Sequence, residues 1–133
     1  MGLEAIPVVV EPADLAAARA VLRELAVLVE RLLATGEGGA IDLGVLPLTP
    51  AARAWLIDRL GRGEVEIRLT AGGQSTITET GCAGVWWVRH GNEAGVVTSE
   101  LLEVAYVPGL VPVSRAEVEN GLQRLNSGLD GLN

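Results

Sequence analysis

The chain has 133 residues, of which 49% are hydrophobic and 20% charged, a composition typical of one globular domain and not of a disordered segment or a disulfide scaffold. The formal net charge is −7, and all ten basic residues are arginines. A chain without a basic stripe lacks the phosphate contacts that supply most nucleic-acid affinity, so we expect neither DNA nor RNA as a partner. The lack of lysine also excludes Schiff-base chemistry.

Cys82 and His90 are the only cysteine and the only histidine. One of each is too few for an intrachain disulfide or for a Cys/His metal cluster in a single protomer, so we expect no metal, no cofactor and a reducing, cytoplasmic location. Cys82 is expected to be a small buried thiol at a strand end, and His90 a solvated turn residue. The alternative is a shared metal contact, which requires both ends of a strand to meet or two copies to dimerise.

No segment is typical of a signal peptide or a membrane-spanning helix. The N-terminal Met1–Glu4 carries no basic region, and charges regularly interrupt the most apolar segment. We therefore expect no membrane insertion.

The first predicted element is a long helix from Pro12 to about Ala34, which follows an apolar run at residues 6–10. Pro12 suits the first helical position, and Asp14 is favourable near the positive end of the helix dipole. At about 100° per residue one wide face is apolar, formed by Val21, Leu22, Leu25, Leu28, Val29, Leu32 and Leu33. This face must be buried, either against the protein's own sheet or against a partner.

A short strand and a second helix follow. Gly36–Gly39 ends the first helix and leads into Ile41–Leu43, which is predicted to be an edge strand. Thr49 is then the predicted N-cap of a helix whose first residue is Pro50, and Gly61 supplies its left-handed stop.

From Glu64 to Tyr106 the pattern is that of β-structure, with strands predicted at residues 65–70, 75–80, 84–89 and 96–107. The connections between them are short, which implies an antiparallel meander. Alternation fails at Leu101-Leu102, and either a bulge or burial on both sides of the sheet would explain this.

The last predicted element is a helix that opens with the capping-box sequence Ser114–Glu117. Gly121 weakens this helix, and the chain is expected to fray from Gly128. The whole pattern predicts an α+β fold in which about three helices pack on an antiparallel meander of about four strands. We expect one domain over residues 1–133, with an ordered core at about 5–126 and a frayed tail at 127–133.

The residues alone indicate no catalytic site. Five glutamates lie on the predicted strands: Glu64, Glu66, Glu79, Glu100 and Glu103. Pairs of them across strands suit an acid/base couple, but no nucleophile motif accompanies them and His90 lies in a predicted turn. Gly36–Gly39 lacks the lysine of a phosphate loop.

Four blocks of sequence carry a family resemblance. They are Ile41-Asp42-Leu43 with Leu46-Pro47-Leu48-Thr49, then Leu60-Gly61-Arg62-Gly63-Glu64-Val65, then Glu79-Thr80 with Gly84-Val85-Trp86-Trp87-Val88, and finally Glu103-Val104 with Val107-Pro108. In this order and spacing they resemble the C-terminal conserved domain of the HupH-type hydrogenase expression/formation proteins. The resemblance covers about Leu22 to Pro112, and members of that family are often longer, with another region upstream.

The resemblance implies an auxiliary, non-enzymatic chaperone or scaffold for NiFe-hydrogenase maturation. Its implied partners are the precursor of the iron–sulfur small subunit or other hydrogenase maturation proteins. The candidate partner-binding residues are Trp86, Trp87, Glu79, Glu103 and Asp42. Two alternatives stay open: a small-ligand module or enzyme that uses strand carboxylates with His90, and a protein that acts through self-association as a homodimer.

Trp86 and Trp87 are successive strand residues, so their rings are predicted to project to opposite faces of the sheet. One ring then enters the core. The other is either an exposed anchor for a partner or is buried because helices cover both faces.

Overall fold

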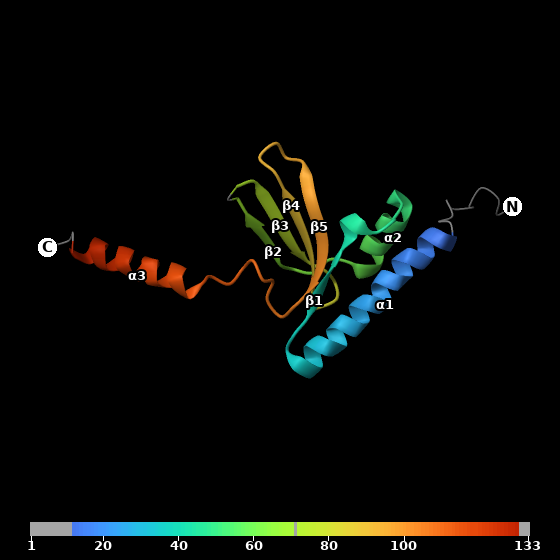
Figure 1. The fold of residues 1–133 in the computed structure, drawn as a ribbon, viewed down its shortest axis with the longest axis horizontal. Helices are drawn as coiled ribbons and strands as arrows, with labels where there is room; N and C mark the ends of the chain where they lie inside the picture. Colours follow the sequence, from blue (N-terminus) through green and yellow to red (C-terminus); the bar gives the residue numbers. More distant parts are fainter. Residues whose placement is uncertain (1–11, 71, 131–133) are drawn as a thin grey trace.

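The computed structural model describes residues 12–70 and 72–130, so the apolar run at residues 6–10 and the end of the expected tail lie outside the described residues. The elements in chain order are α1 (Pro12–Thr35), β1 (Gly39–Asp42), the short 3-10 helix η2 (Leu43–Val45), α2 (Pro50–Leu60), β2 (Glu66–Leu69), β3 (Gln74–Glu79), β4 (Val85–Gly91), β5 (Val97–Val104) and α3 (Arg115–Asp130). The predicted α+β class is confirmed (Figure 1).

The sheet has the strand order β1-β5-β4-β3-β2, and every neighbouring pair is antiparallel. Strands β2 to β5 form the predicted meander. The predicted edge strand joins them as a fifth strand, with Gly39 opposite Val104 and Asp42 opposite Leu101. β1, which follows α1 in the sequence, is therefore paired with the last strand of the meander.

The helix ends follow the local sequence signals. The Thr49 side chain accepts a hydrogen bond from the Ala52 amide at 3.2 Å and caps α2, with Pro50 as its first residue. Gly61 has a φ of 69° and a ψ of −167°, so it ends α2 as predicted but not in the expected left-handed helical conformation, and Gly36, with a φ of 79°, follows α1. Within residues 12–70 and 72–130, no helix combines the length and the apolar character needed to cross a bilayer.

One face of the sheet is covered by α1 and α2, which lie on the same side of it in Figure 1. The main core lies between these layers and contains Val21, Leu25 and Leu32 of α1, Leu56 and Leu60 of α2, and Val85, Leu102 and Val104 of the sheet. The apolar face of α1 is thus buried internally, against α2, β1 and β5. Leu33 is an exception: it is 72% exposed, because it lies at the flank of the stripe, beyond the reach of the sheet.

The opposite face carries a smaller core of Ile77, Trp86 and Val88, which is covered by Val111 from the segment after β5. Leu101 packs with this second core, whereas Leu102 is fully buried in the main one. Burial on both faces therefore explains why alternation fails at Leu101-Leu102. The register shift in this strand pair lies elsewhere, between His90 and Gly91.

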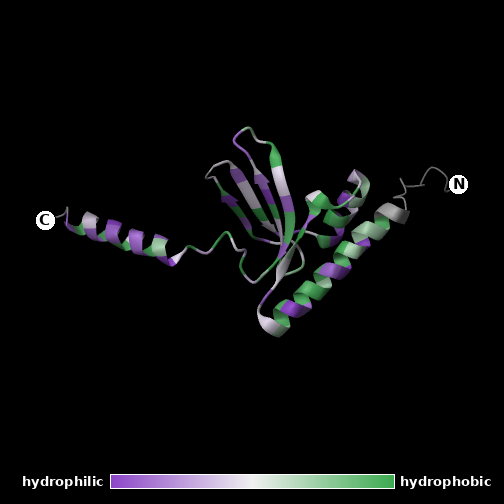
Figure 2. Ribbon diagram, viewed as in Figure 1, coloured by the Kyte–Doolittle hydropathy of each residue, from purple (hydrophilic) through white to green (hydrophobic). Residues whose placement is uncertain are grey.

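The helix α3 differs from expectation in its packing. Its capping box forms as predicted: the Ser114 amide donates to Glu117 at 2.8 Å, and the Glu117 amide donates to the Ser114 hydroxyl at 3.2 Å. The helix continues past Gly128 to Asp130, further than the expected fraying point. It does not pack on the sheet, since none of its residues is buried, and it projects from the body (Figure 1). Hydrophobic and hydrophilic residues alternate along it in Figure 2.

Candidate interaction site

A groove of about 570 Å³ lies between α2 and the strands β2, β3 and β4. The residues that line it are apolar, hydroxyl-bearing or charged, and they include Arg53, Ile57, Arg62, Thr76, Thr78, Glu79, Trp87 and Arg89. The groove exists because α2 packs over the centre of the sheet, where Leu56 and Leu60 meet Val85 and Leu102. The β2 and β3 side of the same face is left open to solvent.

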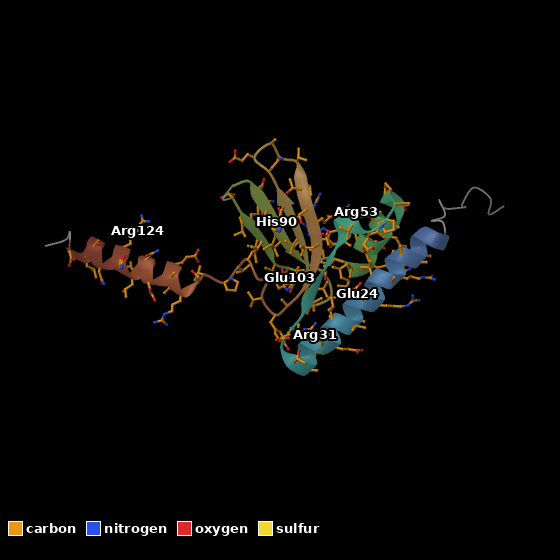
Figure 3. All side chains as sticks on the ribbon, viewed as in Figure 1. Glu24, Arg31, Arg53, His90, Glu103 and Arg124 are labelled. Carbon is orange, nitrogen blue, oxygen red and sulfur yellow. The ribbon has the colours of Figure 1, made fainter. Side chains whose placement is uncertain are left out.

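The Glu100 carboxylate organises the wall of this groove. Arg53 of α2 (Figure 3) donates its Nε to Glu100 Oε1 at 3.1 Å and also pairs with Oε2 through a second guanidinium nitrogen. Trp87 Nε1 donates to Oε2 at 2.7 Å, and Arg89 Nε lies 3.2 Å from the same oxygen. One side chain of β5, only 14% exposed, thus holds groups from α2 and β4.

The charge state of Glu100 follows from these contacts. Burial raises the pKa of its carboxyl, but hydrogen bonds from Arg53 and Trp87 and the positive charges of Arg53 and Arg89 act in the opposite direction and prevail. The pKa of Glu100 is therefore below the ordinary value, and the side chain is an anion at neutral pH.

Trp87 is held from two directions. Its indole nitrogen is fixed by Glu100, and the Arg53 guanidinium lies over its ring at 5.4 Å from the ring centre, within the range of a cation–π contact. Tryptophan and arginine are among the residues most enriched at the energetic centre of protein interfaces. The groove is therefore suited to bind a segment of another protein.

The two tryptophans project to opposite faces, as predicted. Trp87 packs against the main core, while Trp86 belongs to the second core, is 7% exposed, and donates its indole N–H to the Ala105 carbonyl at 2.9 Å. Helices do not cover both faces in the described residues: the segment between β5 and α3 covers the second one. Trp86 does not line the groove.

The three candidate carboxylates each accept a hydrogen bond from a backbone amide. Asp42 accepts from Gly44 at 2.8 Å, Glu79 from Glu64 at 3.0 Å, and Glu103 from Gly109 at 2.8 Å. Each bond fixes a local turn or the approach of a neighbouring segment. Of the five candidate residues, only Trp87 and Glu79 line the groove; Asp42, Trp86 and Glu103 lie elsewhere.

Sequence reasoning missed the roles of Arg53, Arg89 and Glu100. Arg89 and Glu100 are direct cross-strand partners in the register of β4 and β5. The available signal was their opposite charge, since such pairs favour positions facing each other across an antiparallel ladder. Arg53 carried no comparable signal, because its contact depends on how α2 crosses the sheet.

Cys82 and His90 were both placed wrongly. Cys82 is exposed, because it lies in the turn between β3 and β4 and not inside a strand end. His90 is a half-buried residue of β4, because the strand continues to Gly91 through the register shift, and its Nδ1 lies 2.8 Å from the Ser75 hydroxyl. Within residues 12–70 and 72–130, no three His, Cys, Asp or Glu side chains gather as metal ligands.

The chain folds as a small α+β domain with a groove beside α2. Residues 15–131 match the C-terminal conserved region of the HupH hydrogenase expression protein. The chain therefore belongs to the HupH hydrogenase expression protein family.

Its relatives include the hydrogenase expression/formation protein HoxQ of Azotobacter vinelandii, 32% identical over 98% of this chain and 42% of that protein. The hydrogenase-1 operon protein HyaF of Escherichia coli K12 is 30% identical over 65% of the chain and 30% of its own length. The chain spans less than half the length of these curated relatives. The solved structure of the hydrogenase expression protein HupH from Thiobacillus denitrificans superposes with a TM-score of 0.82 at 45% identity, over 86% of this chain and 95% of that one.

Proposed function

We propose that the chain serves NiFe-hydrogenase maturation by binding another protein, without catalysing a reaction itself. The observation that carries this proposal is the family match over residues 15–131. Relatives named as hydrogenase expression/formation proteins support the process. The partner we propose is the iron–sulfur small subunit in its precursor form, met in the cytoplasm before export.

The groove beside α2 is the proposed surface for this partner. An extended segment lying in it would place apolar groups against Ile57 and the exposed part of Trp87. Arg62 and Arg89, both exposed, would donate hydrogen bonds to carboxylates or backbone carbonyls of the segment. Because Glu100 already fixes Arg53 and Trp87, little side-chain entropy is lost when the groove is filled.

The alternative of an enzyme built on strand carboxylates and His90 has less support. Glu79 and Glu103 accept hydrogen bonds from backbone amides. His90 pairs with Ser75 near the end of β4, whereas Thr80, the neighbour of Glu79, bonds to Val85 at the start of that strand. These groups do not converge on one position where a substrate atom would react.

Co-purification tests the proposal with a matched pair of variants. A tagged chain is expressed with a hydrogenase operon, and the recovered subunits are identified by mass spectrometry. We expect the unaltered chain to recover the small-subunit precursor. Arg62→Glu should lower this recovery by about tenfold or more, because it removes an anchor and sets a negative charge against carboxylates of the bound segment.

Arg23→Glu is the control, because Arg23 is exposed on α1 away from the groove and the charge change is the same. It should bind as the unaltered chain does. Recovery of no hydrogenase subunit or maturation protein would overturn the function. Equal binding by Arg62→Glu and the unaltered chain would mean that the groove is not the surface that binds the partner.

A further inference from the structure

The segment from Tyr106 to Leu129 carries more than half of the large hydrophobic side chains that are exposed in the described residues. Of the fifteen large hydrophobic side chains that are exposed in the described residues, eight lie between Tyr106 and Leu129. Four of these are on α3, where Val118, Leu122, Leu125 and Leu129 are 57 to 67% exposed. The labelled Arg124 in Figure 3 shows how far the helix stands from the sheet. The family region extends to residue 131, so this helix is part of the conserved region.

These four residues form one stripe. Their spacings are four, three and four residues, which is the a/d pattern of a helix that packs along another helix. Nothing in the described part of the chain covers this stripe, since α3 has no buried residue. Another helix packed along the stripe would bury it and leave the polar face of α3 in solvent.

Two glycines lie on the same side of α3 as the stripe. Gly121 and Gly128 line its apolar surface together with the four hydrophobic residues. A Cβ added to either would meet no atom within 4 Å, and neither has a positive φ. The chain's own packing and backbone therefore require neither glycine, although glycine disfavours a helix relative to alanine. Two small residues one heptad apart instead suit the close approach of another backbone.

We propose that α3 pairs with α3 of a second copy of this chain, antiparallel about a two-fold axis. The order of spacings, four, three and four, reads the same in both directions. Antiparallel pairing therefore sets Val118 against Leu129 of the copy and Leu122 against its Leu125, and an isologous interface requires such self-complementarity. Gly121 then lies beside Gly128 of the copy on one flank, and Glu119 beside Asn126 on the other, so no like charges meet.

The oligomeric state of the full chain tests this pairing. Light scattering after size exclusion, over a range of concentrations, should show a dimer for the unaltered protein. Leu122→Glu with Leu125→Glu should weaken the dimer by roughly 100-fold or more, because the charges would be buried at the centre of the stripe. The core should stay folded, since α3 does not contribute to it.

The control adds the same charge to the other side of the helix, as Gln123→Glu with Ser127→Glu, and should leave the dimer intact. A monomer at every concentration, a dimer that survives the leucine substitutions, or equal loss in the control would each overturn the proposal. The proposal would also be overturned if the unaltered chain were a monomer and the variant with both leucine substitutions recovered fewer hydrogenase subunits in co-purification. In that case α3 would bind the client and not a second copy.

Replacing both glycines by alanine separates close packing from helix propensity. Gly121→Ala with Gly128→Ala should raise the helix content, yet weaken the dimer by on the order of tenfold if the backbones approach closely at these positions. A tighter dimer would overturn the close antiparallel geometry.

Discussion

Glu100 joins three elements through one carboxylate, because it holds Arg53 of α2, Trp87 and Arg89 of β4, and itself belongs to β5. The arginines are partly exposed, so their loss of hydration is small, whereas Glu100 is mostly buried. Such a group stabilises the fold only while it is charged and paired. The contribution of Glu100 must therefore depend on pH.

Glu100→Gln should lower the free energy of unfolding at neutral pH by about 1 to 2 kcal/mol, since the charge-assisted hydrogen bonds become neutral ones. The folded-state pKa of Glu100 lies below its ordinary value of 4.5, so its contribution is complete above that pH and is lost as the pH falls further. Urea unfolding at a series of pH values checks this. The difference between the two proteins should shrink below pH 4.5; a difference that grows there would contradict the direction of the shift.

The two tryptophans should differ in what they contribute. Trp86→Ala removes a ring that is 7% exposed and its hydrogen bond to Ala105, and should cost about 3 to 5 kcal/mol of folding free energy. Trp87→Phe keeps most of the packing and loses the hydrogen bond to Glu100, at a cost of about 1 kcal/mol. Chemical denaturation measures both. A cost of about 3 kcal/mol or more for Trp87→Phe would mean that its ring is a core residue and is not available to a partner.

At the scale of elements, the sequence predicted what local chemistry decides. The caps at Thr49 and Ser114 form as expected and α2 ends at Gly61, because each of these features depends on residues within one turn. The place of α3 in the fold depends instead on whether any distant surface receives its apolar side. The spacing of Val118, Leu122 and Leu125 predicts an apolar side that needs a cover, but it does not show whether the chain's own sheet supplies that cover.

The loop between α1 and β1 contains two glycines that are needed for different reasons. A Cβ on Gly38 would lie 1.7 Å from the Val104 carbonyl oxygen, whereas a Cβ on Gly36 would meet nothing within 4 Å but would have to adopt a φ of 79°. Gly38→Ala should push β1 away from β5 and cost about 2 to 3 kcal/mol. Gly36→Ala should cost about 1 kcal/mol, from backbone strain alone.

Thermal or urea unfolding compares these two variants, and amide exchange at Ile41 and Leu102 reports on the β1–β5 ladder, where the two residues are paired. Faster exchange should appear only in Gly38→Ala. If Gly36→Ala were the more damaging substitution, the tight approach at Gly38 would not be the constraint that fixes β1.

At the scale of the molecule, the groove was beyond prediction because it is a product of packing. Its walls come from α2 and from three strands, and its position depends on how far α2 covers the sheet. The sequence offered Trp87 and Glu79 as candidates, and both line the groove. It offered Asp42 and Glu103 with equal weight, although neither of them lines the groove. Distinguishing these roles requires the register of the strands.

The purified protein should contain no stoichiometric zinc or iron. Cys82 lies in the turn before β4 and His90 near the end of that strand, which at about 3.3 Å per residue spans roughly 17 Å from Val85 to His90, so one chain cannot bring both to a single ion. Elemental analysis after anaerobic purification measures the metal content. About one ion per chain would contradict this and would point to a site shared between two copies.

The groove and the stripe on α3 share no residue, and the segment that leads to α3 packs on the sheet face opposite the one that carries the groove. A ligand shifts a second equilibrium only if it interacts differently with the two states of that equilibrium. Filling the groove alters no contact of α3, so the coupling free energy between the two surfaces should be close to zero. A client should bind single and paired chains with the same affinity, and substitutions in the two surfaces should add in free energy.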